Sequence, residues 1–562
     1  MNKFRFNILT LTVAAMVGVG ATSCGDSFLD VSSKTESTTG NFYKTENDAW
    51  RALVGCYDGW RQVASGLGGV NNIYLAATIM GDECYGSTGN GDDYKAQVLD
   101  RFDQAQGPSE LMIFSDTWKL YYAAVYRCNE FLLHQDELNW KEDSDKKGLY
   151  LGETRAIRAI LYFDMVRLWG NIPLLLEPSQ DNVPQADPAE VYANIFEDLK
   201  YAAENIPAGA NQGADNFGRI TKYAAEALLA RAYLFYTGYY GKEPGFTTEE
   251  GTTIGSFTKA EALAAVEDVI TNGGYELVGD FKNLWPAASL IPKSKDEVGW
   301  SAESTYAGDA NSEVILAMNF TPTQDYDGNN DSNRWLVMMG MRSLNFSPYG
   351  KGWGACCVTD NFRETFFSNS DLRRTASIID IVGEGVSKLA EYETQVNDWR
   401  EYTGYTVKKY TPLVFGNGLP ATDPKGTMGF QECNAQPWVF VRYADVLLMA
   451  AELGSSNAAT YMHQIRSRAG LGDVAVNQKN IMDERAREFA FEGIRYWDLL
   501  RQGVDVMADA VCASAGNATS GGHATTVTYD KSKIVATQGL CRIPNDQIVL
   551  SNGVLKQNPG WN

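Results

Sequence analysis

The sequence predicts a mostly α-helical protein, in which a tetratricopeptide-like helical scaffold is joined to a loop-rich insertion carrying short strands. Two observations predict this class. Apolar residues recur at helical spacing in several long segments, where small alanines lie opposite large aromatic residues, as closely packed helix pairs require. Between these segments lies a long stretch rich in Gly, Asn, Asp, Ser and aromatic residues, with few sustained helical runs.

The chain is expected to begin with a lipoprotein signal peptide, residues 1–23. Lys3 and Arg5 precede an apolar run from Phe6 to about Gly20, and small residues then lead to Cys24. The run is shorter than the ~20 residues that a helix needs to cross a bilayer. Cleavage before Cys24 would make it the lipid attachment site, an arrangement that resembles the lipobox of bacterial lipoproteins. The alternative is an ordinary secreted protein in which Cys24 is incidental.

The mature chain, residues 24–562, is expected to form a single domain. Its helical scaffold covers about 40–237 and 436–505, and a loop-rich, ligand-facing region covers about 238–435. Helical periodicity predicts the individual helices, and the loop-rich stretch is expected to carry short strands, one of which is given below. The helices are expected over 45–64, 116–134, 153–169, 188–205, 222–236, 440–453, 458–469 and 480–502, and the strand over 313–320.

Composition excludes one class of partner. Hydrophobic residues make up 44% of the chain, enough to bury a substantial core, and the net charge is -22. A nucleic-acid groove needs Lys and Arg to neutralise phosphates, so no nucleic acid is expected as a partner. Attraction to anionic lipid head groups is disfavoured for the same reason, which leaves the lipid anchor as the only expected membrane contact.

Cysteine and histidine usage argues against a metal or cofactor. Nine cysteines are present, and an even number remains once Cys24 is set aside. An even count in an exported protein permits disulfides but does not demonstrate them. No C-x-x-C pair occurs, and the vicinal Cys356 and Cys357 are poorly placed to chelate one metal. The three histidines are far apart in sequence, so no cofactor and no catalytic dyad is expected.

Acids and arginines alternate in the segment 484–501. The acids are Glu484, Glu488, Glu492 and Asp498, and the arginines are Arg485, Arg487, Arg495 and Arg501. One interpretation is a general acid and base pair, and the other is a lattice of ion pairs that ties helices together. The lattice is favoured because each carboxylate has a nearby arginine to hold it ionised, whereas a catalytic acid needs isolation from cations.

Several segments carry a family resemblance. The segment ERAREFAFEGIRYWDLLRQG, 484–503, is the clearest, and VRYADVLLMAAELG, QIRSRAGL and the closing IPNDQIVLSNGVLKQNPGW follow the same pattern, as do RAIRAILYFDMVRLWGNIPLL and GRITKYAAEALLARAYLF. In this order they resemble the SusD/RagB family of surface nutrient-binding lipoproteins. The resemblance also implies that the C-terminal QNPGW docks against the body of the protein.

The resemblance implies a function as well. Family members lie over a SusC-like, TonB-dependent outer-membrane transporter, where they capture ligand and close over the barrel. An oligosaccharide is therefore the expected ligand, and the outer surface of the outer membrane the expected location, with no enzymatic activity. Two alternatives stay open, capture of a peptide or other nutrient and a scaffold that binds no ligand. A glycoside hydrolase would need two carboxylates roughly 5 to 10 Å apart across a cleft, which no segment singles out.

Sugar rings have an apolar face and a fringe of hydroxyls, so a glycan site needs exposed aromatic plates with polar side chains at their edges. The first candidate is the Gly-rich stretch 81–94, with Tyr85, Asn90, Asp92 and Tyr94. Its position and its DEC start resemble the loop from which starch-binding family members present an aromatic residue. This chain has no Trp-rich run there, which puts starch itself in doubt. The alternative is a solvated loop in which Tyr85 packs inward.

The second candidate is a set of aromatic residues in the loop-rich region. They are Trp300, Tyr306, Trp335, Tyr349 and Trp353, among Gly, Asn and Ser. Trp335, with Asn333 and Arg334 beside it, and Trp300 with Tyr306 rank highest. Any one of these rings is more often part of a core than a binding platform.

A last constellation has the oxygen-rich spacing of a calcium loop. Asp325, Asp327, Asn329 and Asp331 alternate in the segment 325–331. The segment departs from an EF-hand, because position six is Asn330 and the twelfth position is Leu336. A turn rich in Asx residues is therefore the preferred interpretation.

Overall fold

The computed structural model describes residues 42–561 except 66–71, 104–111, 143 and 323–330. The expected signal peptide and Cys24 lie outside these residues. Among the residues described, we find no helix that combines the length and the apolar character needed to span a bilayer.

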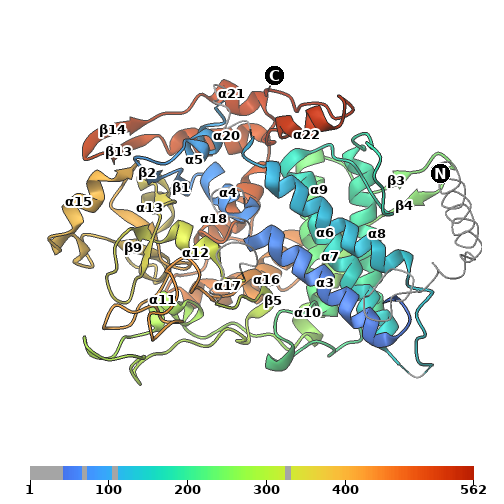
Figure 1. Ribbon diagram of the computed structural model, residues 1–562, viewed down its shortest axis with the longest axis horizontal. Coiled ribbons are helices and arrows are strands. Elements are labelled where there is room, and N and C mark those ends of the chain that lie inside the picture. Colours follow the sequence, from blue (N-terminus) through green and yellow to red (C-terminus); the bar gives the residue numbers. More distant parts are fainter. Residues whose placement is uncertain (1–41, 66–71, 104–111, 143, 323–330, 562) are drawn as a thin grey trace, which may run out of the picture.

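The scaffold is a series of long helices that pack as neighbours along the chain, and they form one half of the molecule (Figure 1). They are α3 (Glu46–Ser65), α6 (Ser115–Leu133), α7 (Lys146–Trp169), α8 (Pro188–Asn205), α9 (Lys222–Tyr240) and α10 (Lys259–Asn272). The expectation of a mostly α, tetratricopeptide-like protein is confirmed.

Glycine sets the spacing where two scaffold helices cross. A Cβ added at Gly59 of α3 would lie 3.0 Å from the Cβ of Ala124 in α6. Such a contact is tighter than most real ones, so a larger residue would press against α6, whereas glycine lets the two backbones approach closely. The small residues expected from the sequence therefore serve close helix packing.

Helix α10 was not predicted, and its residues were assigned to the loop-rich region. Its start is nevertheless well signalled, because Thr258 and Glu261 form a reciprocal capping box at its N-terminus. It packs against α9 and against α16 (Tyr443–Leu453), so the scaffold continues past residue 237. The loop-rich assignment was wrong for this segment because Gly and aromatic residues on both sides masked a short alanine-rich helix.

The other helices are shorter. They are α4 (Ile73–Met80), α5 (Lys95–Arg101), α11 (Pro286–Ser289), α12 (Arg334–Met339), α13 (Asp360–Phe366), α14 (Arg373–Ser377), α15 (Tyr392–Asn397), α17 (Ala458–Arg468), α18 (Gln478–Glu488), α19 (Arg495–Leu500), α20 (Val504–Ala513), α21 (Lys531–Ala536) and α22 (Asn545–Leu550), with 3-10 turns η3 (Ala214–Asn216), η4 (Phe281–Leu284) and η5 (Val386–Lys388).

The strands are short and belong mainly to the other half of the molecule (Figure 1). They are β1 (Cys84–Tyr85), β2 (Thr88–Gly89), β3 (Phe246–Thr247), β4 (Thr253–Ile254), β5 (Val314–Met318), β6 (Met341–Arg342), β7 (Lys351–Gly352), β8 (Cys357–Val358), β9 (Ile378–Asp380), β10 (Trp399–Arg400), β11 (Tyr405–Val407), β12 (Trp438–Arg442), β13 (Gly516–Ser520) and β14 (His523–Val527). One sheet has the order β1-β8-β11-β9, and the other strands form pairs.

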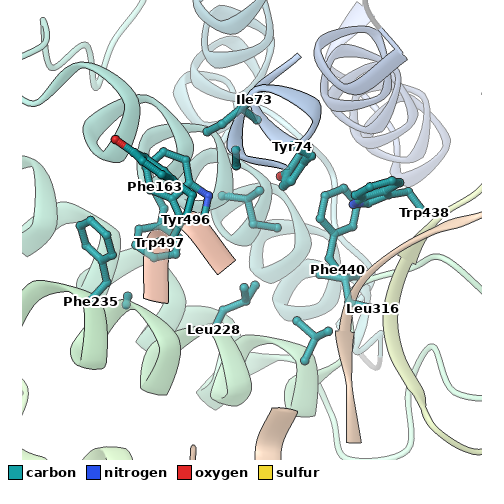
Figure 2. Packing of buried hydrophobic residues seen from close by; sticks show 14 of the residues in the cluster. Ile73, Tyr74, Phe163, Leu228, Phe235, Leu316, Trp438, Phe440, Tyr496 and Trp497 are labelled. Atoms are coloured by element: carbon teal, nitrogen blue, oxygen red, sulfur yellow. The ribbon is translucent and has the colours of Figure 1, made fainter. Parts of the chain in front are cut away.

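The expected strand 313–320 is present as β5, which pairs antiparallel with β12. Because β12 runs to Arg442, the helix that we expected from residue 440 begins only at Tyr443. Figure 2 shows how this pair meets the helices in the core. The labelled side chains are Ile73 and Tyr74 of α4, Phe163 of α7, Leu228 and Phe235 of α9, Leu316 of β5, Trp438 and Phe440 of β12, and Tyr496 and Trp497 of α19.

The single helix expected over 480–502 is broken into α18 and α19. Phe491 and Gly493 adopt positive φ angles of 64° and 69°, and a Cβ at Gly493 would lie 3.1 Å from Tyr74. The break lets the Phe491 N–H donate to the buried Glu83 carboxylate at 2.7 Å. Tertiary contacts thus override the helical periodicity of the segment.

The acids of this segment are held in a buried ion-pair lattice, as favoured from the sequence. Glu488 accepts hydrogen bonds from Arg373 at 2.9 Å, from Arg442 at 2.6 Å and from Arg468 at 2.5 Å. These guanidinium groups hold the pKa of the Glu488 carboxyl well below its usual range, against the effect of burial. The guanidinium partners of Glu488 come from α14, β12 and α17, so the lattice fastens distant segments together.

The C-terminus docks on the body of the protein, as the resemblance implied. The Asn558 amide donates to the backbone oxygens of Trp169 at 2.9 Å and Cys541 at 2.7 Å. The Trp561 indole N–H donates to the Leu540 oxygen at 2.8 Å.

Candidate functional site

The first candidate loop is fastened to a strand from the middle of the chain. Thr88 and Gly89 of β2 pair with Arg400 and Trp399 of β10. The Asn90 N–H donates to the Asp398 oxygen at 3.0 Å. Residues 90–94 are therefore held beside residues about 300 positions later, an adjacency that local sequence spacing does not reveal.

Arg400 organises the backbone of this loop. Its guanidinium donates to the backbone oxygens of Asn90 at 3.0 Å, Asp92 at 3.1 Å and Asp93 at 3.0 Å. The same group lies 4.1 Å from the centre of the Tyr94 ring. Tyr94 is still 58% exposed, so its ring offers apolar surface to a ligand while Arg400 fixes its position.

Arg342 joins the loop to the second candidate stretch. Its Nε donates to Oδ2 of Asp398 at 2.9 Å, and its Nη1 donates to Oδ2 of Asp92 at 3.3 Å and to the Trp353 oxygen at 3.2 Å. We call the set Asn90, Asp92, Tyr94, Arg342 and Asp398 the Arg342 surface. It combines an exposed aromatic ring with carboxylates, an amide and a guanidinium, the groups that bind sugar hydroxyls.

Trp353 borders the Arg342 surface. It follows β7, whose Gly352 pairs with Arg342 of β6. The ring is partly buried against the main core, and the Arg334 guanidinium lies 5.7 Å from its centre. Among the aromatic residues of the second candidate set, Trp353 is therefore the one that contacts the Arg342 surface in the structure.

A buried acid lies beneath the loop. The Asp100 carboxylate accepts a hydrogen bond from the Gly86 N–H at 3.1 Å. Burial, followed by the nearby Glu401 carboxylate, raises the pKa of Asp100 to about 8. This buried acid supports the loop through its backbone and is not one of the residues of the Arg342 surface.

Three of the predicted aromatic plates are buried. Tyr85 is 1% exposed, and its hydroxyl donates to the Ser514 oxygen at 2.7 Å, so it packs inward as the alternative interpretation held. Trp335 is 2% exposed and meets the Trp438 ring edge to face at 4.3 Å. Tyr349 is 4% exposed and its hydroxyl donates to Glu384. Because these rings have no free face, their assignment as exposed plates is corrected to core packing.

The polar neighbours of Trp335 have structural roles. The Asn333 side chain caps α12 by accepting from the Trp335 N–H at 3.0 Å, and it donates to the Gln436 oxygen at 2.7 Å. Asn333 is fully buried and Arg334 is 4% exposed. A helix cap beside a buried tryptophan has the same residue types as a glycan-binding platform. The sequence alone therefore could not distinguish the two for Trp335 and its neighbours.

Trp300 and Tyr306 are partly exposed. The contacts that the structure shows for them are with residues outside the Arg342 surface. The Trp300 ring packs against Phe415 at 5.0 Å. The Tyr306 hydroxyl donates to Asp309, and burial together with that carboxylate raises the pKa of Tyr306 far above its ordinary value. The two rings therefore do not join the Arg342 surface.

Three of the four proposed calcium ligands, Asp325, Asp327 and Asn329, lie outside the described residues. Asp331 is described, and its carboxylate pairs with Arg61 at 2.8 Å. Among the described residues no cluster of His, Cys, Asp and Glu has the arrangement of a metal site.

Sequence reasoning missed Arg342, Asp398 and Arg400. Nothing local marks them, since each is an ordinary charged residue in a loop-rich stretch. Their role follows from the pairing of β2 with β10 and of β6 with β7, both of them pairs of two-residue strands.

Two family models match this chain. One is described as "SusD family" and matches residues 312–561, and the other is described as "Starch-binding associating with outer membrane" and matches residues 71–234. SusD-like protein P2 of Formosa agariphila is 24% identical, with 79% of this chain and 80% of that protein covered. A SusD-like protein of Bacteroides ovatus is 23% identical, with coverages of 87% and 82%.

Solved structures share the fold. A "laminarin binding SusD-like protein" superposes with a TM-score of 0.70 at 24% identity, covering 92% of this chain and 100% of that chain. Surface glycan-binding protein A from Bacteroides thetaiotaomicron, in complex with laminarihexaose, gives a TM-score of 0.67 at 21% identity, covering 92% and 99%.

Proposed function

This chain belongs to the SusD/RagB family, and we propose that it captures an oligosaccharide at the cell surface and delivers it to a SusC-like, TonB-dependent transporter. In this proposal Cys24 carries the lipid anchor and the protein faces the exterior of the outer membrane. It binds its ligand without chemical conversion.

The Arg342 surface is the observation that carries the proposal. An exposed ring whose position is fixed by Arg400 supplies a stacking plate, worth about 1 kcal/mol per sugar ring. The carboxylates of Asp92 and Asp398 flank the Arg342 guanidinium, so hydrogen-bond acceptors and donors lie side by side. Sugar hydroxyls both donate and accept, and this alternation suits them.

The relatives point to the same ligand class. Two of the structures that share this fold are named for binding laminarin and laminarihexaose. These names concern those proteins, and the cargo of this chain is tested separately. Laminarihexaose belongs in the panel as one member beside plant and host oligosaccharides.

Calorimetric titration of the mature chain against such a panel tests the proposal. We expect saturable binding of one glycan class with no release of product. A chain that binds a peptide and no glycan would redirect the proposal to another nutrient. A chain that binds neither, but copurifies with its transporter, would be a scaffold.

A further inference from the structure

A second concave surface lies between α3 and the turn that precedes α9, and it shares no lining residue with the Arg342 surface. This groove has a volume of about 470 Å³. Binding sites for small ligands are typically about 300 to 1,000 Å³, so the groove is large enough for two or more sugar units. Its walls include Tyr57, Arg61, Phe217, Arg219, Asn319 and Asp331.

The charges that line the groove neutralise one another. Arg61 pairs with Asp58 at 2.7 Å and with Asp331 at 2.8 Å. Arg219 donates through Nε to Glu153 at 3.2 Å. Because each of these cations already has a carboxylate partner, the groove suits an uncharged ligand rich in hydrogen-bonding groups better than an ion.

The walls are held in place by a buried acid. Glu153 is fully buried, and it accepts hydrogen bonds from Arg219 and from the Tyr57 hydroxyl. The Ile220 N–H donates to the Tyr57 oxygen at 2.8 Å, which ties the turn before α9 to α3. Such a wall loses little freedom when a ligand binds, so less of the binding free energy is spent on ordering it.

One wall contains an unsatisfied donor. Trp60 lines the groove and is 2% exposed, yet its indole N–H has no hydrogen-bond partner in the described part of the chain. Buried donors are nearly always paired with protein, water or ligand, so a lone indole N–H needs an explanation. The Trp60 ring adds apolar surface to the groove lining.

We propose that this groove is a second binding site for a neutral oligosaccharide, an inference that rests on the proposed function. A neighbouring depression of about 330 Å³ shares Phe217, Gly218 and Arg219 with it and adds Tyr275 to the lining. Because the two depressions meet at residues 217–219, together they offer room for several sugar units. A long polysaccharide would then be held at two places by one chain, which raises its apparent affinity without a new contact at either.

Val54 gives a direct way to fill the groove. It lines the groove from α3 and is 46% exposed, so Val54→Trp adds bulk there without crowding the core. Val549→Trp is the matched control, because Val549 is 75% exposed on α22 and is absent from the groove lining. Tyr94→Ala weakens ligand binding at the Arg342 surface without changing the groove.

The mature chain and these variants would be titrated with the oligosaccharide panel and with the corresponding polymers, laminarihexaose and laminarin included. We expect Val54→Trp to weaken polymer binding at least about tenfold, while Val549→Trp binds as the unaltered chain does. We also expect Val54→Trp to weaken further the residual oligosaccharide binding of the Tyr94→Ala chain. Unchanged polymer binding by Val54→Trp would overturn the second site alone. An unaltered chain that binds nothing in the panel would overturn the proposed function, and the second site with it.

Discussion

Nε of Arg342 donates to Oδ2 of Asp398 at 2.9 Å, and through this contact two stretches of chain 56 residues apart form one surface. The same guanidinium reaches Asp92 and the Trp353 backbone, so a single side chain fixes the edges of the candidate glycan site. Arg342 is largely buried while Asp398 is half exposed, which leaves the carboxylate free to accept from a ligand as well.

Arg342→Met is expected to weaken glycan binding about tenfold or more, because it removes a ligand donor and releases Asp92 and Asp398 from their fixed positions. The loss should appear in titration calorimetry with a melting temperature close to that of the unaltered chain. Arg374→Met is the matched control, since Arg374 pairs with Glu364 at 3.3 Å and touches no part of the Arg342 surface. Equal effects of both substitutions would count against the site.

Tyr94→Ala should reduce affinity about five- to tenfold, because one stacked ring contributes about 1 kcal/mol or somewhat more. Tyr126→Ala serves for comparison, as Tyr126 is 48% exposed on α6 and lies outside the candidate site. Unchanged glycan affinity in Tyr94→Ala would show that the Tyr94 ring does not contribute to binding.

Trp335→Ala is expected to lower the free energy of unfolding by about 3 to 5 kcal/mol, because it empties a space inside the aromatic core. Trp335 packs on Trp438 and on Tyr74, at ring distances of 4.3 and 5.3 Å. Urea denaturation measures the change. A stable variant with lost glycan binding would instead restore Trp335 as a binding residue.

Glu83 should make stability depend on pH. Burial raises its pKa to about 8 in the folded protein, against an ordinary value of 4.5. Between these values the folded state binds more protons than the unfolded state, so the contribution of Glu83 is complete below about pH 4.5 and is lost as the pH rises through 8. The unfolding free energy of the unaltered chain should therefore fall, relative to that of Glu83→Gln, between pH 5 and pH 8. Parallel pH profiles for the two proteins would contradict the assignment.

Arg442→Ala should destabilise the fold by about 3 to 5 kcal/mol, because it takes one counter-ion from each of three buried carboxylates. Arg442 pairs with Glu313, Glu488 and Glu492 at 2.7, 2.6 and 2.9 Å. Lys479→Ala, which breaks the exposed pair with Asp483, should cost less than about 1 kcal/mol. Similar small losses for both would mean that the lattice contributes little to stability.

Local signals predicted much of the scaffold. Helix α8 has the predicted bounds 188–205, because Pro188 at its first turn and the capping Asp187 mark its start in the sequence itself. The ion-pair lattice was also predicted as a lattice, since alternating acids and arginines imply mutual neutralisation. Its actual partners, such as Arg373 for Glu484, come from segments that no helical spacing connects.

The candidate site was only partly predictable. Asn90, Asp92 and Tyr94 were marked by a polar, Gly-rich loop, whereas Arg342 and Asp398 become site residues only through tertiary strand pairing. Trp335 was ranked among the highest candidates because its neighbours are polar, yet the Asn333 side chain caps a buried helix. Residue type indicates what a side chain can bind, and burial decides whether it is available.

Titration calorimetry of the chain from residue 25 onward against the oligosaccharide panel, beside Tyr94→Ala and Arg342→Met, tests the central claim most directly. The account predicts saturable binding of one glycan class, weakened by both substitutions, with the ligand recovered intact. Absence of binding across the panel, or recovery of a shortened glycan, would contradict it.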